Sequence, residues 1–178
     1  MKFAMILLAA LFVRIETTAG SIVVQLDPAH APITAKNFLR YVDAHKYDGA
    51  SFYRVVRPGN QSPHRPIQVI QGGLDVERFG PYGPIALEPT SRTGLHNSAG
   101  TIAIARDKPP NTGSSEFFIN MVDDPLLDAQ HSPDHFGYAV FGRVVRGMDV
   151  ARRIHRSHAN GQRLAPPIRI LRMVRVRI

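Results

Sequence analysis

Short β-rich runs, separated by loops rich in glycine and proline, follow one another along most of this 178-residue chain and leave few folds open. The first two runs, residues 13–17 and 21–26, are joined by Thr18-Ala19-Gly20, and a short connection that ends in glycine is typical of a β-hairpin. Six further runs are predicted as strands: residues 51–57, 67–71, 101–106, 116–121, 138–145 and 168–178. The length suits a single domain, and no internal repeat or low-complexity linker divides it.

Two segments have the periodicity of helices instead of strands. Between residues 31 and 46, apolar side chains recur at i, i+3, i+4 and i+7, at Ala35, Phe38, Leu39 and Val42. A shorter apolar face follows Gly147, at Met148, Ala151 and Ile154. These elements predict a mainly β fold, a closed eight-stranded antiparallel β-barrel capped by two α-helices, because closure removes exposed sheet edges.

The composition excludes several kinds of site and raises one question about partners. The chain has no cysteine, which excludes disulfides, thiolate zinc sites and cysteine nucleophiles. Its net charge is +8, and from Arg143 onward it carries ten arginines but only one acidic residue, Asp149. Such a tail can bind phosphate groups, yet no aromatic side chain lies among these arginines to stack on bases. We therefore expect a solvated basic face and no specific nucleic-acid binding.

The N-terminus has the beginning of an export signal but not its length. Lys2 precedes an apolar stretch over residues 3–12, which is shorter than the roughly 20 residues of a membrane-spanning helix and the about 15–30 residues of a secretory signal. Residues 1–12 are thus predicted to be a truncated signal or the apolar start of a strand, and residues 13–178 the domain. No stable membrane insertion is expected. The stretch favours a periplasmic or cell-envelope location, with the cytoplasm as the alternative.

The common catalytic motifs of hydrolases and nucleotide-binding proteins are missing. No glycine-rich loop is followed by Lys-Ser/Thr, and there is no Gly-x-Ser-x-Gly nucleophile elbow. Two histidine pairs, His131 with His135 and His155 with His158, have no evident third ligand. We therefore expect solvated histidines, neither metal nor organic cofactor, and no hydrolase activity.

Two of the predicted strands carry side chains suited to a binding site. If residues 52–56 alternate regularly, Phe52, Arg54 and Val56 share one face, and an arginine among apolar side chains needs a partner or a ligand. Phe117 and Phe118 must point to opposite faces of their strand, so that one can fill the core while the other lines a surface pocket.

Together with other motifs, these strands resemble the cyclophilin-type peptidyl-prolyl cis-trans isomerases, in the family's order and at nearly its spacing, over roughly residues 13–178. The motifs are Phe52-Tyr-Arg-Val-Val56, Val69-Ile-Gln-Gly-Gly73, Gly100-Thr-Ile-Ala-Ile-Ala-Arg106, Ser115-Glu-Phe-Phe-Ile-Asn120, Leu127-Asp128 and Phe136-Gly-Tyr-Ala-Val-Phe-Gly142. Tyr138 stands where animal members usually carry histidine, which favours a bacterial type.

The resemblance implies an isomerase that rotates X–Pro peptide bonds, without a cofactor, and assists protein folding. It assigns the catalytic guanidinium to Arg54. It also assigns substrate binding to ten residues: Val69, Gln71, Ile104, Ala105, Arg106, Glu116, Phe118, Leu126, Leu127 and Tyr138. The implied partners are proline-containing peptides and unfolded or folding proteins, and a monomer is expected.

Departures from the family pattern predict a weaker pocket. Residues 60–67 are an insertion, rich in proline and with a positive charge at Arg65, which we expect to project as a loop at the rim of the pocket. Gln68 stands at the family's Phe position, Glu116 at its Gln and Leu126 at an aromatic position, so apolar binding area is lost. The alternatives to an active isomerase are a catalytically weak cyclophilin-like module that binds Pro-containing peptides, and a basic protein that binds RNA or a membrane surface.

Overall fold

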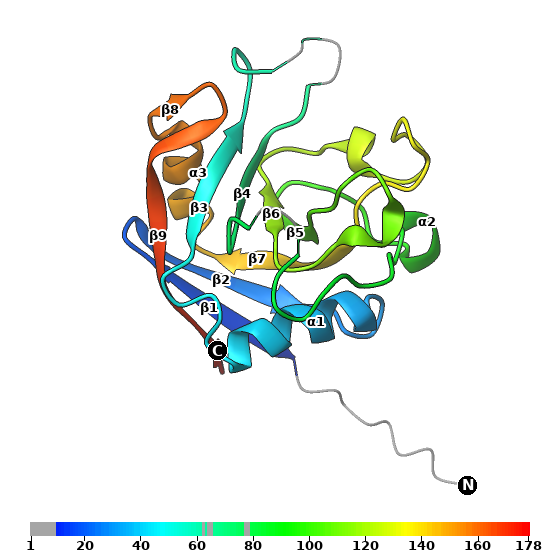
Figure 1. Ribbon diagram of the computed structural model, residues 1–178, viewed down its shortest axis with the longest axis horizontal. Coiled ribbons are helices and arrows are strands. Elements are labelled where there is room, and N and C mark those ends of the chain that lie inside the picture. Colours follow the sequence, from blue (N-terminus) through cyan, green and yellow to red (C-terminus); the bar gives the residue numbers. More distant parts are fainter. Residues whose placement is uncertain (1–9, 62, 64–65, 77–78) are drawn as a thin grey trace, which may run out of the picture.

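The computed structural model describes residues 10–61, 63, 66–76 and 79–178 (Figure 1). Within these ranges the strands are β1 (Leu11–Thr17), β2 (Gly20–Leu26), β3 (Ser51–Val56), β4 (Val69–Gly73), β5 (Thr101–Ile104), β6 (Phe117–Asn120), β7 (Val140–Arg146), β8 (Ala159–Asn160) and β9 (Arg163–Val176). The α-helices are α1 (Pro32–Asp43), α2 (Thr90–Thr93) and α3 (Met148–Arg156), and the 3₁₀ helices are η1 (Pro110–Thr112) and η2 (Pro125–Leu127).

The strands form one antiparallel sheet that closes on itself. Their order is β1-β2-β7-β5-β6-β4-β3-β9-β8, and a further pairing of β1 with β9 completes the barrel. β8 has two residues and pairs with β9, so eight strands make the wall. The predicted closed eight-stranded antiparallel barrel is confirmed. In Figure 1, α1 lies below the barrel and α3 beside β3. The one-turn helix α2 was not predicted, because Thr-Ser-Arg-Thr has no apolar period.

The interior of the barrel is filled by side chains from the strands, α1 and α3. Where α1 meets β6, the ring of Phe38 packs edge-on against Phe117, with centroids 5.5 Å apart. The buried hydroxyl of Tyr47 donates a hydrogen bond to the backbone oxygen of Ser115 at 2.9 Å. β2 and β7 approach so closely that a Cβ atom at Gly142 would lie 2.4 Å from the backbone oxygen of Gln25. The core thus combines aromatic packing with a backbone contact that only glycine permits.

The barrel starts two residues earlier than the sequence predicts. Leu11 and Phe12, assigned above to the N-terminal segment, are the first residues of β1, and Phe12 pairs with Gln25 in β2 and with Val176 in β9. Residues 1–9, on which the predicted export signal depends, lie outside the described residues. Among the helices that the structure describes, none is both long and apolar enough to span a membrane.

The last strand is also longer than predicted, since β9 begins at Arg163 and not at residue 168. Proline cannot donate to a strand ladder, which argued against a strand through Pro166 and Pro167. The ladder between β3 and β9 accommodates them, because its register shifts and pairs Phe52 with Ile168 but Arg54 with Arg163. The prolines lie in the unpaired interval between these two positions.

The same irregularity places Arg54 on the outside of the barrel. Opposite β4 the register of β3 also shifts between Phe52 and Arg54, which is a β-bulge. Phe52 and Val55 therefore face the interior core, whereas Val56 belongs to a separate outer cluster. The prediction that Phe52, Arg54 and Val56 share one face was wrong, because the extra residue of the bulge breaks the strict alternation.

Candidate active site

A cavity of about 230 Å³ lies on the outer surface of the barrel, where β3, β4 and β6 meet the segments after β5 and before β7. The ladder registers bring its central side chains together, since Arg54 is paired with Gln71 and Gln71 with Phe118. The residues that line it are Arg54, Ile67, Val69, Gln71, Ala105, Arg106, Asp107, Phe118, Leu127 and Tyr138.

One side of this cavity is apolar. Phe118 points away from the interior core, opposite to Phe117, as the alternation predicts. Its ring meets the edge of Tyr138, with centroids 5.4 Å apart and planes at 84°. The apolar cluster that includes it is Val56, Val69, Ala103, Phe118, Leu127 and Val140. This cluster offers a flat aromatic ring and branched aliphatic groups to a small apolar ligand.

The opposite side of the cavity holds the half-buried guanidinium of Arg54. Its Nε and Nη2 both donate to Oε1 of Gln162, at 2.9 and 2.7 Å, and its Nη1 donates to Oε1 of Gln71 at 2.7 Å. Arginine carries five N–H donors, so the bonds found within the described ranges leave two N–H groups for a ligand. None of the ion pairs found in the described part of the chain includes Arg54.

A chain of hydrogen bonds fixes the amide of Gln71. Its Nε2 donates to the hydroxyl of Tyr53 at 2.8 Å, and that hydroxyl donates to Oε2 of Glu116 at 2.7 Å. Burial, followed by the charge of Glu116, raises the pKa of Tyr53 far above its ordinary value, which keeps the hydroxyl protonated as a donor. Burial also raises the pKa of Glu116, although bonds from Tyr53 and Ser115 oppose that rise. The oxygen of the Gln71 amide is thereby directed at Arg54.

Arg106, the second arginine at the cavity, has four of its five N–H donors engaged within the protein. Its Nε donates to the backbone oxygen of Gly137 at 2.7 Å, its Nη1 to the backbone oxygens of Asp107 and Lys108, and its Nη2 to the carboxylate of Asp134. Its guanidinium carbon also lies 4.9 Å from the centre of the Tyr138 ring. Arg106 therefore supports the cavity wall, and its charge is compensated.

The insertion reaches the cavity through its last residue, Ile67. The side-chain amide of Gln61 donates to the backbone oxygen of Ile67 at 2.7 Å and accepts its N–H at 2.9 Å, so the two ends of the loop are tied together. The next N–H, of Gln68, donates to Oδ2 of Asp124 at 3.0 Å, directly before η2. Burial of Asp124 raises the pKa of its carboxyl to about 6. Ile67 thus offsets the loss of apolar surface expected at Gln68, whereas Arg65 lies outside the described residues.

The structure brings eight of the predicted site residues to the cavity and places three elsewhere. The eight are Arg54, Val69, Gln71, Ala105, Arg106, Phe118, Leu127 and Tyr138. The side chain of Ile104 is buried in the interior core. Glu116 does not line the cavity and is connected to Gln71 through the hydroxyl of Tyr53. Leu126 lines an adjoining cavity of about 420 Å³ together with Lys108 and Pro133.

Sequence reasoning missed Tyr53, Ile67, Asp107 and Gln162. With Phe52 facing inward, regular alternation would turn Arg54 inward as well, and the bulge is what places Arg54 on the same side of the strand as Tyr53. Gln162 is distant in sequence from Arg54, so no local pattern connects the two. A signal for Ile67 was present, since it is an apolar residue one position before the expected strand position Gln68.

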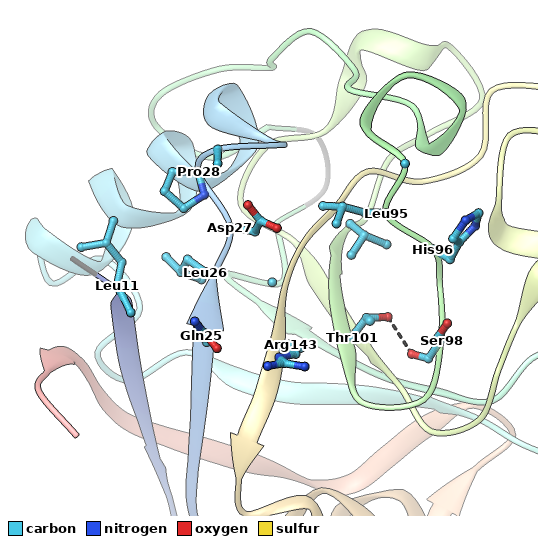
Figure 2. Close-up of a pocket in the computed structure, with 15 residues that line it drawn as sticks. Leu11, Gln25, Leu26, Asp27, Pro28, Leu95, His96, Ser98, Thr101 and Arg143 are labelled. Atoms are coloured by element: carbon cyan, nitrogen blue, oxygen red, sulfur yellow. Dashed lines mark hydrogen bonds between the residues drawn. The ribbon is translucent and has the colours of Figure 1, made fainter. Parts of the chain in front are cut away.

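A larger cavity, of about 580 Å³, lies at a different part of the barrel surface (Figure 2). β2, β7 and the segment before β5 form it, and Figure 2 shows Leu26, Leu95 and Arg143 around the space. The hydroxyl of Thr101 donates to the backbone oxygen of Ser98 at 2.7 Å at its edge. Arg54 and Phe118 do not line it. The size of a cavity therefore does not identify the active site. The smaller cavity is the candidate, because Arg54 and Phe118 line it.

The histidines that the structure describes form no metal centre. Among the described residues there is no group of three or more His, Asp or Glu side chains that could hold a metal ion. A ring nitrogen of His155 lies 2.9 Å from the backbone oxygen of Val56, and one of His158 lies 3.1 Å from that of Ala165. These two histidines thus contribute hydrogen bonds to the fold.

Comparison with known proteins agrees with the fold and the motifs. The profile of the family described as "Cyclophilin type peptidyl-prolyl cis-trans isomerase/CLD" matches residues 12–175. Peptidyl-prolyl cis-trans isomerase A of Dickeya dadantii is 40% identical over 145 residues, which cover 80% of this chain and 70% of the relative. Isomerase B of Escherichia coli is 36% identical over 146 residues, which cover 80% of this chain and 82% of the relative. The chain belongs to the cyclophilin-type peptidyl-prolyl cis-trans isomerases.

Solved structures show the same fold. The crystal structure of a cyclophilin-type isomerase from Cryptosporidium parvum matches with a TM-score of 0.79 and 22% identity, covering 95% of this chain and 99% of the other. A second structure of that protein, determined in the presence of the dipeptide Ala-Pro, matches with a TM-score of 0.75 and 23% identity, covering 92% and 97%.

Proposed function

We propose that this isomerase holds the proline of an X–Pro bond in the cavity between Phe118 and Arg54, and that Arg54 is the catalytic residue. The observation that carries the proposal is the guanidinium of Arg54, which faces an apolar recess and, among the described residues, has two N–H groups left over and no carboxylate paired to it. At about 230 Å³ the recess is smaller than the roughly 300–1,000 Å³ of ordinary ligand sites, which suits a single ring and not a whole ligand.

The reaction needs no covalent step. Rotation about a peptide bond crosses a barrier of roughly 18–20 kcal/mol, and an X–Pro bond takes tens to hundreds of seconds without a catalyst. In the twisted transition state the amide resonance is lost and the nitrogen regains a lone pair that can accept a hydrogen bond. Arg54 can donate to that nitrogen only when it is twisted, so the interaction favours the transition state over the planar ground state.

The apolar side of the cavity holds the ring while the bond rotates. Phe118, Val69 and Leu127 offer the pyrrolidine ring a surface from which water is excluded. The lower local dielectric also strengthens the hydrogen bond from Arg54. The amide of Gln71 has one N–H beyond the bond to Tyr53, and this N–H is suited to a substrate carbonyl.

The substrates we propose are proline-containing segments of unfolded or folding proteins, taken up by a monomer. The site lies open on the barrel surface, and a solved relative was crystallised in the presence of Ala-Pro. The basic tail supports no separate nucleic-acid function, because four of its arginines form ion pairs: Arg153 with Asp149, Arg163 with Asp75, Arg172 with Glu16 and Arg175 with Asp43.

The test measures cis-trans exchange in an Ala-Ala-Pro-Phe peptide by NMR, without a coupled protease, for the unaltered protein, Arg54→Ala and Arg54→Lys. We expect both variants to lose at least about tenfold in exchange rate, since a lysine point charge cannot replace the planar fork. Arg152→Ala, on the exposed face of α3, is the control and should keep full activity. Unchanged exchange in either Arg54 variant would remove Arg54 from the mechanism. Peptide binding without exchange in the unaltered protein would instead favour the weak binding module.

A further inference from the structure

We propose that Gln162 is a positioning residue for this reaction: it aims the guanidinium of Arg54 at the proline nitrogen through a single neutral carbonyl oxygen. The inference rests on the proposed function of Arg54. Gln162 does not line the cavity and so acts through Arg54, not on the substrate.

The geometry of the contact determines the orientation of the guanidinium. Oε1 of Gln162 accepts from both Nε and Nη2 of Arg54, and these two bonds fix one edge of the planar group. Oε1 of Gln71 accepts from Nη1 on the other side. With both sides held, the side chain has few rotamers left, and its remaining N–H groups keep one direction. Such pre-orientation contributes much of an enzyme's rate enhancement. Displacing a catalytic group by about 1 Å can lower the reaction rate by about 10²-fold.

The backbone of Gln162 is itself attached to the strand that carries Arg54. Gly161 and Gln162 form the turn between β8 and β9, in which Asn160 pairs with Arg163. The backbone oxygen of Gln162 accepts the N–H of Val55, the residue after Arg54, at 2.8 Å. The distance between the two side chains is therefore set by a direct strand-to-turn contact.

Asn60 fixes which way the amide of Gln162 points. Nε2 of Gln162 donates to the backbone oxygen of Asn60 at 3.0 Å, which leaves its oxygen for Arg54. The side chain of Asn60 in turn donates to the backbone oxygens of Val55 and Gly161, at 3.1 and 3.0 Å. The first residue of the insertion thus closes a small network around Gln162.

The neutrality of this support distinguishes Arg54 from two nearby arginines, Arg106 and Arg163. Arg106 and Arg163 are each paired with an aspartate, whose negative charge compensates the guanidinium. Arg54 is held by two amide oxygens, and no carboxylate from the part of the chain that the structure describes is paired with it. Its full positive charge therefore stays available to strengthen the bond to the twisted amide.

The test compares Gln162→Leu, which keeps the size but removes the acceptor, with Gln162→Glu, which keeps the acceptor but adds a charge. For Gln162→Leu we expect kcat to fall by about tenfold or more with KM within about threefold, since the group acts on the transition state. We expect Gln162→Glu to lower kcat as well. Its carboxylate would still hold Arg54, but its negative charge would compensate the positive charge of the guanidinium. Asn160→Ala, in the same turn, is the matched control and should retain full kcat.

A spectroscopic readout separates positioning from a loss of structure. The ¹H–¹⁵N resonance of Arg54 Nε, assigned by its absence in Arg54→Lys, should exchange slowly with solvent in the unaltered protein and much faster in Gln162→Leu. Backbone amide spectra should otherwise match. An unchanged kcat in Gln162→Leu, or a rise confined to KM, would overturn the proposal while a loss in Arg54→Ala still supports the site. Full activity of Arg54→Ala would instead overturn the proposed function itself.

Discussion

Replacing Asp124 with asparagine is expected to flatten the dependence of stability on pH. Asp124 is 3% exposed, and its carboxylate accepts the N–H of Gln68. Burial raises its pKa from the ordinary value of 3.8 to about 6, against the effect of the Gln68 bond and with a smaller contribution from the charge of Asp123. The folded chain therefore binds a proton at this site more readily than the unfolded chain does.

The sign and size of the effect follow from that difference. Between pH 6 and 3.8 the folded state holds more protons, so the free energy of unfolding rises as the pH falls through this range. At 1.36 kcal/mol per pKa unit the full effect is about 3 kcal/mol, of which about 2 kcal/mol accrues between pH 7 and pH 4.5. Asparagine cannot titrate but retains an acceptor for Gln68, so Asp124→Asn should lack this contribution.

Urea unfolding at pH 7, 6, 5 and 4.5 measures the difference, because the other titrating groups are common to both proteins and cancel. With a denaturant dependence of about 2 kcal/mol per molar, the wild-type midpoint should rise by about 1 M relative to that of Asp124→Asn as the pH falls to 4.5. Asp123→Asn, at the exposed neighbour, is the control: it removes only the smaller contribution of the Asp123 charge, so most of the wild-type pH dependence should remain. Parallel midpoints for wild type and Asp124→Asn would refute the reasoning.

Three further predictions concern packing and charge. Phe118→Ala should cost about 3–5 kcal/mol of stability by urea unfolding and raise the KM for the peptide, because it removes the buried ring from the cavity wall; an unchanged KM would place the proline elsewhere. Gly142→Ala should lower stability by at least about 1–3 kcal/mol, since its Cβ would meet the backbone of Gln25, and an unchanged melting temperature would contradict this contact. Binding of a DNA oligonucleotide, followed by fluorescence anisotropy, should be weak and vanish by about 0.2 M salt, whereas a sequence-selective complex at that salt would show a specific surface.

The fold could be predicted from the sequence because its signals are local. The hairpin glycine at residue 20, the helical period around Phe38 and the short strand runs each depend on neighbouring residues, and closure follows from the need to remove sheet edges. The errors at strand ends arose where pairing decides the boundary, as at Pro166 and Pro167, which β9 carries through an unpaired interval of its ladder.

Only part of the site could be predicted from the sequence, because its geometry depends on strand register and on contacts between residues far apart in the chain. The motifs led to Arg54, Gln71 and Phe118, which the structure brings together. The bulge that turns Tyr53 and Arg54 to the same side has no local signature, because β4 and β9 impose it. The role of Gln162 could not be predicted for the same reason, because its hydrogen bonds to Arg54 form only when β9 pairs with β3.

The barrel closes only when β9 pairs with β1 and β3, so closure must come last when the chain is synthesised. β1 and β3 each need β9 as a neighbour, and Phe12 pairs with Val176 almost at the far end of the chain. At about 5–20 residues per second, the first strand must wait many seconds for its partner to be made. Until then the nascent chain presents two open sheet edges, which are the surfaces on which strands from different chains associate. Loss of β9 by premature termination should therefore yield an aggregating fragment and not a smaller barrel.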